Sequence, residues 1–197
     1  MSLSDLAAAR RTHKAFGPEP VPREALLELL ATARFAPTHH LNQPWRFRVL
    51  GPETLAALKR VAGEKEAQKL DRAPTLVLAT AALTGDLAMD EEDVCATAAA
   101  IQLVLLAATE RGIATYWRTP QVLRTKTGRE AVGIPHGERF PGLLHFGTAE
   151  RDPSPREREP VERYVEFLPE LRAVSPGRGS STPDSGVPTT SGRGGLR

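Results

Sequence analysis

The sequence predicts a globular domain that combines helices with strands. Apolar residues recur at helical spacing in several segments, and other segments show the alternating or continuous apolar runs that are typical of strands. Hydrophobic residues make up 40% and charged residues 25% of the 197-residue chain. These values are ordinary for a soluble protein, and the length is ample for one domain with a proper core.

The first half of the chain predicts helix, helix, strand, helix and strand. Residues 3–11 form a short helix, and "REALLELLATARFA" at 23–36 places leucines at helical spacing. "WRFRVL" at 45–50 alternates apolar and basic residues, as a strand with one solvated face does. "PETLAALKRVAG" at 52–63 is an amphipathic helix pattern, and "APTLVLATAAL" at 73–83 predicts a strand buried on both faces.

The second half predicts one long helix and then strand, helix and strand. Residues 90–111 begin with "DEED", which suits the helix dipole, and are apolar nearly all round. Such a helix must be surrounded, either inside a core or partly by another subunit. "GIATYWRT" at 112–119 predicts a strand, "PQVLRTKTGREAVG" at 120–133 a helix, and "GLLHFG" at 142–147 a strand.

The composition changes near residue 174. Residues 174–197 contain no aromatic residue and many Gly, Ser, Thr and Pro. Such a segment does not bury enough surface to offset chain entropy, so we expect a disordered tail. Residues 1–173 are expected to form the single folded domain.

Charge and cysteine usage narrow the class of protein. The net charge is only +2, which argues against a nucleic-acid-binding surface built from "RRTHK" and the tail. Cys95 is the only cysteine, so no internal disulfide forms, and its apolar setting predicts a buried thiol in a reducing compartment. The N-terminus lacks the apolar core of a signal peptide, and Thr97 and Gln102 interrupt the longest apolar run. We therefore expect a cytoplasmic protein without a membrane span.

The segment "RRTHK" is the first candidate site. Arg10, Arg11, Thr12 and Lys14 supply guanidinium, hydroxyl and ammonium donors that match phosphate oxygens. The same residues also fit a helix C-terminus followed by a solvated basic turn, and this segment taken alone favours that second interpretation.

The connection "FAPTHHLNQPWRF", at 35–47, is the second candidate site. Asn42 and Gln43 carry paired amide donors and acceptors that can read the edge of a heterocycle, and His39 is a further hydrogen-bonding group. The alternatives are turn chemistry for Asn42 and rim exposure for the histidines. Adjacent histidines without nearby Cys or carboxylates make a poor ligand set, so we expect no metal.

The third candidate site is "YWRTP", where Trp117, Arg118 and Thr119 stand at the end of a predicted strand. A buried Trp beside a surface Arg is the alternative.

Motifs for dinucleotides, nucleoside triphosphates, serine nucleophiles and zinc are absent from the sequence. The three sites together suggest a bound, phosphorylated flat heterocycle that carries the chemistry.

These segments, with "ERGIATYWRT" and "LLHFGTAE" later in the chain, resemble the FMN-dependent nitroreductase family over about residues 5–165. "APTHHLNQPWRF" together with "YWRT" is most similar to its compact YdjA-like branch. The resemblance implies an α+β fold with a central mixed sheet flanked by helices. It also implies an intertwined homodimer with two FMN sites at the interface, with helix 90–111 in the dimer core.

The resemblance also implies roles for single residues. Arg10, Arg11 and Thr12 would hold the phosphate end of FMN, with Lys14 in place of a common Arg. His39 and Gln43, beside Asn42, would reach over from the partner subunit, and the set Trp117, Arg118 and Thr119 would return to the first subunit's FMN.

The activity implied is hydride transfer from NADH or NADPH through FMN to an oxidised acceptor such as a nitroaromatic or a quinone. The flavin carries this chemistry, so we assign no residue a catalytic role. The alternative is a flavin-binding carrier or sensor without turnover. It predicts bound FMN that NAD(P)H reduces very slowly.

Overall fold

The computed structural model describes residues 2–168, which contain fourteen short and long elements. These divide between a compact unit that ends at Arg156 and a second unit that begins at Glu157. In the first unit the elements are, in chain order, α1 (Leu3–Ala9), α2 (Arg23–Ala31), η1 (Thr32–Phe35), η2 (His39–Leu41), β1 (Trp45–Val49), α3 (Pro52–Val61), α4 (Glu64–Leu70), β2 (Thr75–Ala82), α5 (Leu87–Glu110), β3 (Ala114–Arg118), η3 (Gln121–Arg124), α6 (Lys126–Ala131) and β4 (Glu138–Gly147).

The four strands form one sheet in the order β1-β2-β4-β3. Every pairing is antiparallel, with Arg46 opposite Thr80, Val77 opposite Leu144 and Trp117 opposite Leu144 on the other side of β4. The expected mixed sheet is therefore not found among the described residues. Strands that run in the same direction, β1 with β4 and β2 with β3, are never neighbours in this order.

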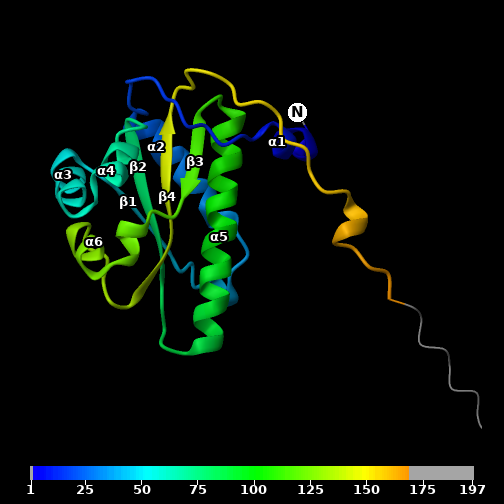
Figure 1. Ribbon diagram of the computed structural model, residues 1–197. Coiled ribbons are helices and arrows are strands. Elements are labelled where there is room, and N and C mark those ends of the chain that lie inside the picture. The colour runs from blue at the N-terminus through cyan, green and yellow to red at the C-terminus, as the bar shows by residue number, and fades with distance from the viewer. Residues whose placement is uncertain (1, 169–197) are drawn as a thin grey trace, which may run out of the picture. The chain divides into compact units, whose positions relative to one another are not determined.

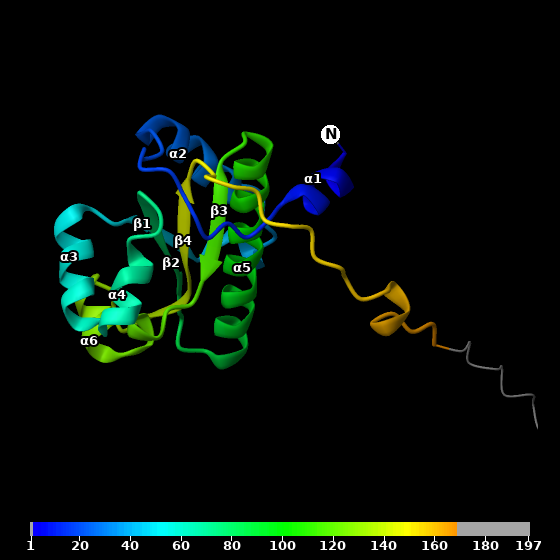
Figure 2. The same cartoon turned by 45° about the horizontal axis from the view of Figure 1, so that its top comes forward.

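Helices cover both faces of the sheet, as Figures 1 and 2 show from two directions. On one face α2, η1 and α5 enclose a core in which Leu29, Ile101 and Phe146 are fully buried. On the other face α3, α4, η3 and α6 enclose a second core around Leu58, Leu70 and other residues. This arrangement confirms the α+β class.

Helix α5 is the longest element and runs along the sheet (Figure 1). An 18-residue window of it has a mean hydropathy of 1.4, which is high enough for a membrane span by composition alone. Core helices reach the same value, and α5 buries Ala100, Ile101 and Val104 against the sheet. Its opposite side carries Cys95, which is exposed. The expectation of a buried thiol is therefore wrong, because none of residues 2–168 covers that side of α5.

Most predicted elements are present with small boundary shifts. Helix 23–36 becomes α2 followed by the 3-10 turn η1, and helix 120–133 becomes η3 followed by α6. The central strand β2 is buried along nearly its whole length, as its unbroken apolar run predicts. Helix α4 was not predicted, because its sequence "EKEAQKL" is charged on most sides and buries only Leu70.

The second unit is described only up to residue 168 and contains the 3-10 turn η4 (Val161–Arg163). Several apolar side chains of this unit are exposed, including those of Tyr164 and Phe167. The domain boundary expected at residue 173 and the tail 174–197 lie outside the described residues.

Candidate functional site

The segment Arg10–Lys14 lies beside β3, an edge strand of the sheet. The backbone N–H of His13 donates to Thr115 O at 2.9 Å, and further along Phe16 forms a bridge with Ala149. Exposure alternates along the segment, with Thr12 and Lys14 exposed and Arg11 and His13 half-buried. The β3 edge thus fixes the backbone of the segment while two donor side chains remain accessible.

Arg11 has a structural role in addition to any ligand contact. Its Nη1 donates to Ala8 O and, at 3.3 Å, to Arg10 O, so it closes the C-terminus of α1. Arg11 and His13 also line a pocket of about 420 Å³ between α1, the end of α5 and residues 149–155. His13 Nε2 lies 3.8 Å from Asp152 Oδ1 in this pocket.

The connection between η1 and β1 has a strained backbone. His40, Leu41 and Gln43 have φ values of 47°, 55° and 46°, in the left-handed region that non-glycine residues rarely adopt. Such conformations persist only where surrounding contacts hold them, and they gather at functional sites. The strained backbone therefore supports this loop as a candidate functional site, as the sequence also indicated.

Two acidic residues of α5 hold the loop. Asn42 Nδ2 donates to Asp93 Oδ1 at 2.6 Å, and His39 Nδ1 lies 3.2 Å from Glu92 Oε2. Both Asn42 amide atoms have partners in the same chain, because Asn42 Oδ1 accepts from the Thr38 hydroxyl. The loop is thus attached to the first half of α5.

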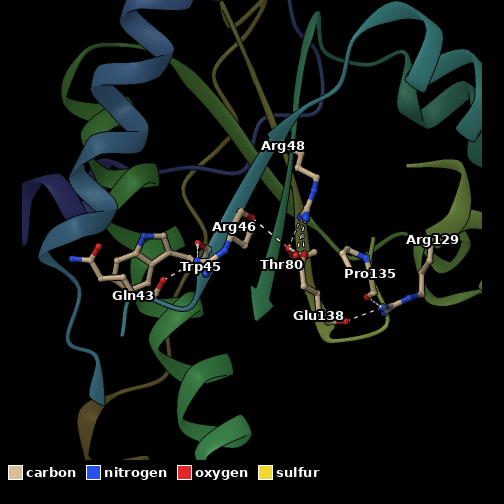
Figure 3. A network of polar contacts seen from close by, with 8 residues as sticks. All are labelled: Gln43, Trp45, Arg46, Arg48, Thr80, Arg129, Pro135 and Glu138. Carbon is tan, nitrogen blue, oxygen red and sulfur yellow. Dashed lines mark hydrogen bonds and ion pairs between the residues drawn. The ribbon is translucent and has the colours of Figure 1, made fainter. Parts of the chain in front are cut away.

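A polar network fixes the strand that follows the loop (Figure 3). Arg48 of β1 forms two hydrogen bonds of 2.7 Å with Glu138 at the start of β4, and Thr80 of β2 bonds to both side chains. Burial favours a raised pKa for Glu138, but the hydrogen bonds from Arg48 and Thr80 outweigh it, and the pKa is lowered. Arg46 Nη1 donates to Gln43 O at 2.9 Å, and this bond joins β1 to the end of the loop.

Trp117 and Arg118 at the end of β3 point to opposite faces of the sheet. Trp117 packs on the α5 side, and its Nε1 donates to Pro141 O at 3.2 Å. Arg118 lies on the α4 side, where it pairs with Glu66. Its Nη1 is buried without a hydrogen-bond partner among the described residues. Thr119 is exposed just beyond the strand.

One protomer does not bring all the predicted site residues together. Arg11 and His13 line a pocket with Thr109 near the end of α5, whereas Asn42 is bonded to Asp93 near its start. Since an α-helix rises about 1.5 Å per residue, Asp93 and Thr109 lie roughly 24 Å apart along α5. The basic segment and the amide loop therefore occupy different ends of this helix.

Three acidic residues that serve these sites were missed from the sequence. Glu92 and Asp93 belong to "DEED", which was interpreted only as favourable charge at a helix start, although α5 begins three residues earlier at Leu87. Asp90 accepts from the N–H groups of Thr84 and Gly85 instead. Glu66 belongs to the unpredicted α4. The available signal for such a partner was Asp93, an acidic residue more than one turn inside a largely apolar helix.

A family model for the nitroreductase family matches residues 7–66 and 52–148, which is well over half of the chain. The chain belongs to the nitroreductase family. YfhC of Bacillus subtilis is 29% identical over 182 residues, covering 84% of this chain and 94% of YfhC. YdjA of Escherichia coli is 26% identical over 145 residues, covering 66% of this chain and 79% of YdjA. The family inferred from the sequence is confirmed.

Solved structures agree on the nitroreductase fold. A nitroreductase-like family protein from Bacillus cereus superimposes with a TM-score of 0.78 at 24% identity, covering 85% of this chain and 96% of that protein. A Desulfovibrio desulfuricans protein solved in complex with FMN gives a TM-score of 0.72 at 22% identity, covering 84% and 96%. These similarities establish the fold.

Proposed function

We propose that this chain is an FMN-dependent oxidoreductase that passes hydride from NADH or NADPH to an oxidised acceptor such as a nitroaromatic or a quinone. Membership of the nitroreductase family supports the reaction class. The names of YfhC and YdjA both include NAD(P)H nitroreductase, and the Desulfovibrio desulfuricans relative was solved with FMN.

The donor groups of the Arg10–Lys14 segment fit a phosphorylated cofactor. Thr12 and Lys14 are exposed on a backbone that the β3 edge holds, and Arg10 ends α1 directly before them. A hydroxyl, an ammonium and guanidinium groups within five residues form charge-assisted hydrogen bonds to a phosphate. We assign the phosphate end of FMN to Arg10, Arg11, Thr12 and Lys14.

The observation that carries the proposal is the separation of the two candidate groups along α5. Because Asn42 and Gln43 belong to one end of this helix and Arg11 and His13 to the other, one protomer supplies two incomplete sites. A homodimer in which α5 helices pack side by side completes both. Cys95 and Gln102, exposed on α5, then lie in the subunit interface.

In this assembly FMN supplies the redox chemistry when it is bound, and the protein binds and orients it. In each site, Arg10 of one chain binds the phosphate end of FMN. His39 and Gln43 of the other chain, supported by Asn42, complete the same site. We assign Trp117, Arg118 and Thr119 at the end of β3 to the same FMN, with Trp117 on the α5 side of the sheet and Arg118 on the α4 side. Glu66 holds Arg118, whose buried Nη1 has no hydrogen-bond partner among the described residues. No side chain is assigned an acid or base role.

An absorbance spectrum and one kinetic trace test the proposal. Purified protein should show a flavin band, or gain one when FMN is added, and anaerobic NADH or NADPH should bleach it rapidly in a stopped-flow instrument. Flavin that is bound but reduced only very slowly indicates a carrier or sensor instead. Protein that shows no flavin and gains none refutes the assignment.

Localisation follows from the same proposal. A pyridine-nucleotide oxidoreductase with one cysteine, Cys95, and so without an internal disulfide suits a reducing compartment, and we propose the cytoplasm. A cell fractionation that follows FMN-dependent NAD(P)H oxidation provides the check.

A further inference from the structure

We propose that Asp93, on α5, is a positioning residue that holds the loop His39–Gln43 in its ligand-facing conformation by acting through Asn42. The inference rests on the proposed function, because the ligand that this loop faces is the proposed flavin. Asp93 itself does not reach the ligand in this assignment.

A continuous chain of hydrogen bonds connects Asp93 to Gln43. Asn42 Nδ2 donates to Asp93 Oδ1 at 2.6 Å, and the Thr38 hydroxyl donates to Asn42 Oδ1. The backbone N–H of Gln43 then donates to Thr38 Oγ1 at 3.2 Å. The first bond joins the loop to α5, and the other two lie within residues 38–43, so displacement of Asp93 or Asn42 is transmitted to the backbone of Gln43.

The backbone of the loop needs such support. His40, Leu41 and Gln43 all have positive φ, and the left-handed conformation costs a non-glycine residue roughly 1–2 kcal/mol. Leu41 is 80% exposed, so its own packing contributes little to holding this shape. The interactions that fix it are the bonds of Asn42 and His39 to Asp93 and Glu92 of α5, and the bonds of Thr38 to Asn42 and Gln43 within the loop.

The burial of Asp93 indicates a specific purpose. Its residue is only 1% exposed, and an unpaired buried carboxylate is strongly unfavourable. The Asn42 amide satisfies it across 51 positions of sequence. An apolar residue would fill this position on α5 without that cost, so the carboxylate is best explained by the loop it holds.

The arrangement also gives Asn42 a different role from the cofactor contact proposed from the sequence. Its amide oxygen faces Thr38 and its amide nitrogen faces Asp93. Asn42 is thus the connecting link. Gln43, whose side chain has no hydrogen bond among the described residues, is the residue presented to the ligand.

A reciprocal exchange of the two side chains tests the proposal. Asn42→Asp places a carboxylate against Asp93, and at pH 8 the repulsion should weaken FMN binding about tenfold or more. The double variant Asn42→Asp with Asp93→Asn restores a donor–acceptor pair of reversed polarity. FMN affinity should return to within about threefold of the wild type, a recovery that additive structural damage does not give.

Two further variants keep the test decisive. Thr38→Val removes the hydroxyl between Asn42 and Gln43 and should weaken FMN binding to a similar extent, even if Asn42→Asp does not fold. Glu91→Gln removes an exposed acid from the same turn of α5 and should leave FMN affinity unchanged. Light scattering and unfolding curves show that each variant has kept its assembly and fold.

The readouts separate failure of this inference from failure of the proposed function. Wild-type protein that binds FMN, with Asn42→Asp or Thr38→Val binding it equally well, overturns the role of Asp93. If the wild type binds no FMN, the proposed function fails, and hydrogen exchange of the Gln43 amide then tests the loop directly. Exchange should be faster in Asn42→Asp and slow again in the exchanged pair; equal rates overturn the inference.

Discussion

His145 is fully buried in β4, and both of its ring nitrogens lack hydrogen-bond partners among the described residues. Its ring lies 5.5 Å from that of Tyr116 and 6.5 Å from that of Phe16, measured between centroids. Burial lowers the pKa of His145 to about 3, and the charges of Arg118 and Arg72 act in the same direction. The folded protein therefore holds this imidazole neutral.

This histidine should make the protein less stable in mild acid. Between the unfolded pKa of 6.5 and the folded value of about 3, the unfolded chain binds the extra proton, so stability falls as the pH falls. From pH 7.5 to 5.0 the loss attributable to His145 should be about 2 kcal/mol.

Urea unfolding at pH 7.5 and pH 5.0, at one protein concentration, measures this loss. His145→Phe should be less sensitive to pH than the wild type, and His136→Gln, at an exposed histidine, should behave as the wild type does. Equal pH sensitivity of His145→Phe and the wild type would show that His145 is protonated in the folded state.

At this scale the sequence indicates candidate site residues but not which partners they have. Asn42 and Arg118 were identified from local motifs, whereas their acidic partners Asp93 and Glu66 lie 51 and 52 positions away. Pairing over such distances depends on the packing of α5 and α4, which a single sequence does not specify.

At the scale of elements, periodicity predicted the strands and the long helices because burial imposes it. Helix α4 has one buried leucine and little periodicity, and for that reason the pattern does not show it. The positive φ of Gln43 was equally hidden, since Gln is not a residue that usually marks a left-handed turn.

The contact between β3 and β4 at Trp117 depends on Gly142. A Cβ added at Gly142 would lie 2.0 Å from Trp117 Nε1, so Gly142→Ala forces the indole off its site. We expect a loss of about 2 kcal/mol in the free energy of unfolding, as is typical of overpacking. A change in tryptophan emission and weaker FMN binding should accompany it.

Gly137→Ala is the matched control, because nothing lies within 4 Å of a Cβ added there. Denaturant unfolding and flavin titration of the two variants check the prediction. If Gly142→Ala is as stable as Gly137→Ala and binds FMN equally well, Trp117 is not constrained by β4.

At the scale of the whole molecule, the strand order and the antiparallel pairing were beyond what the pattern of elements determines. The family resemblance supplied the α+β class, and the apolar character of residues 90–111 indicated that α5 needs neighbours on every side. The protomer covers only part of that surface, and Cys95 and Gln102 are left exposed.

In the proposed homodimer, a charge placed on this open side of α5 should separate the subunits. Ala98 is one turn from Cys95 and one turn from Gln102 on the same helix face, so Ala98→Glu would bury a carboxylate in the proposed interface. We expect a 21.3 kDa monomer that has lost FMN.

Light scattering coupled to size-exclusion chromatography, with flavin absorbance on the same trace, measures both quantities. Ala56→Glu makes the same change on an exposed position of α3 and should leave a flavin-loaded dimer. A dimer that retains FMN despite Ala98→Glu would place the interface elsewhere.

The length of α5 also predicts complementation between two inactive variants of the chain. In the proposed homodimer the two ends of α5 contribute to different FMN sites, so a chain damaged at Arg10 and a chain damaged at Gln43 have complementary defects. When the two are unfolded together and allowed to reassort, hybrid pairs should regain one undamaged cavity, and activity should reappear in a mixture of two inactive parents.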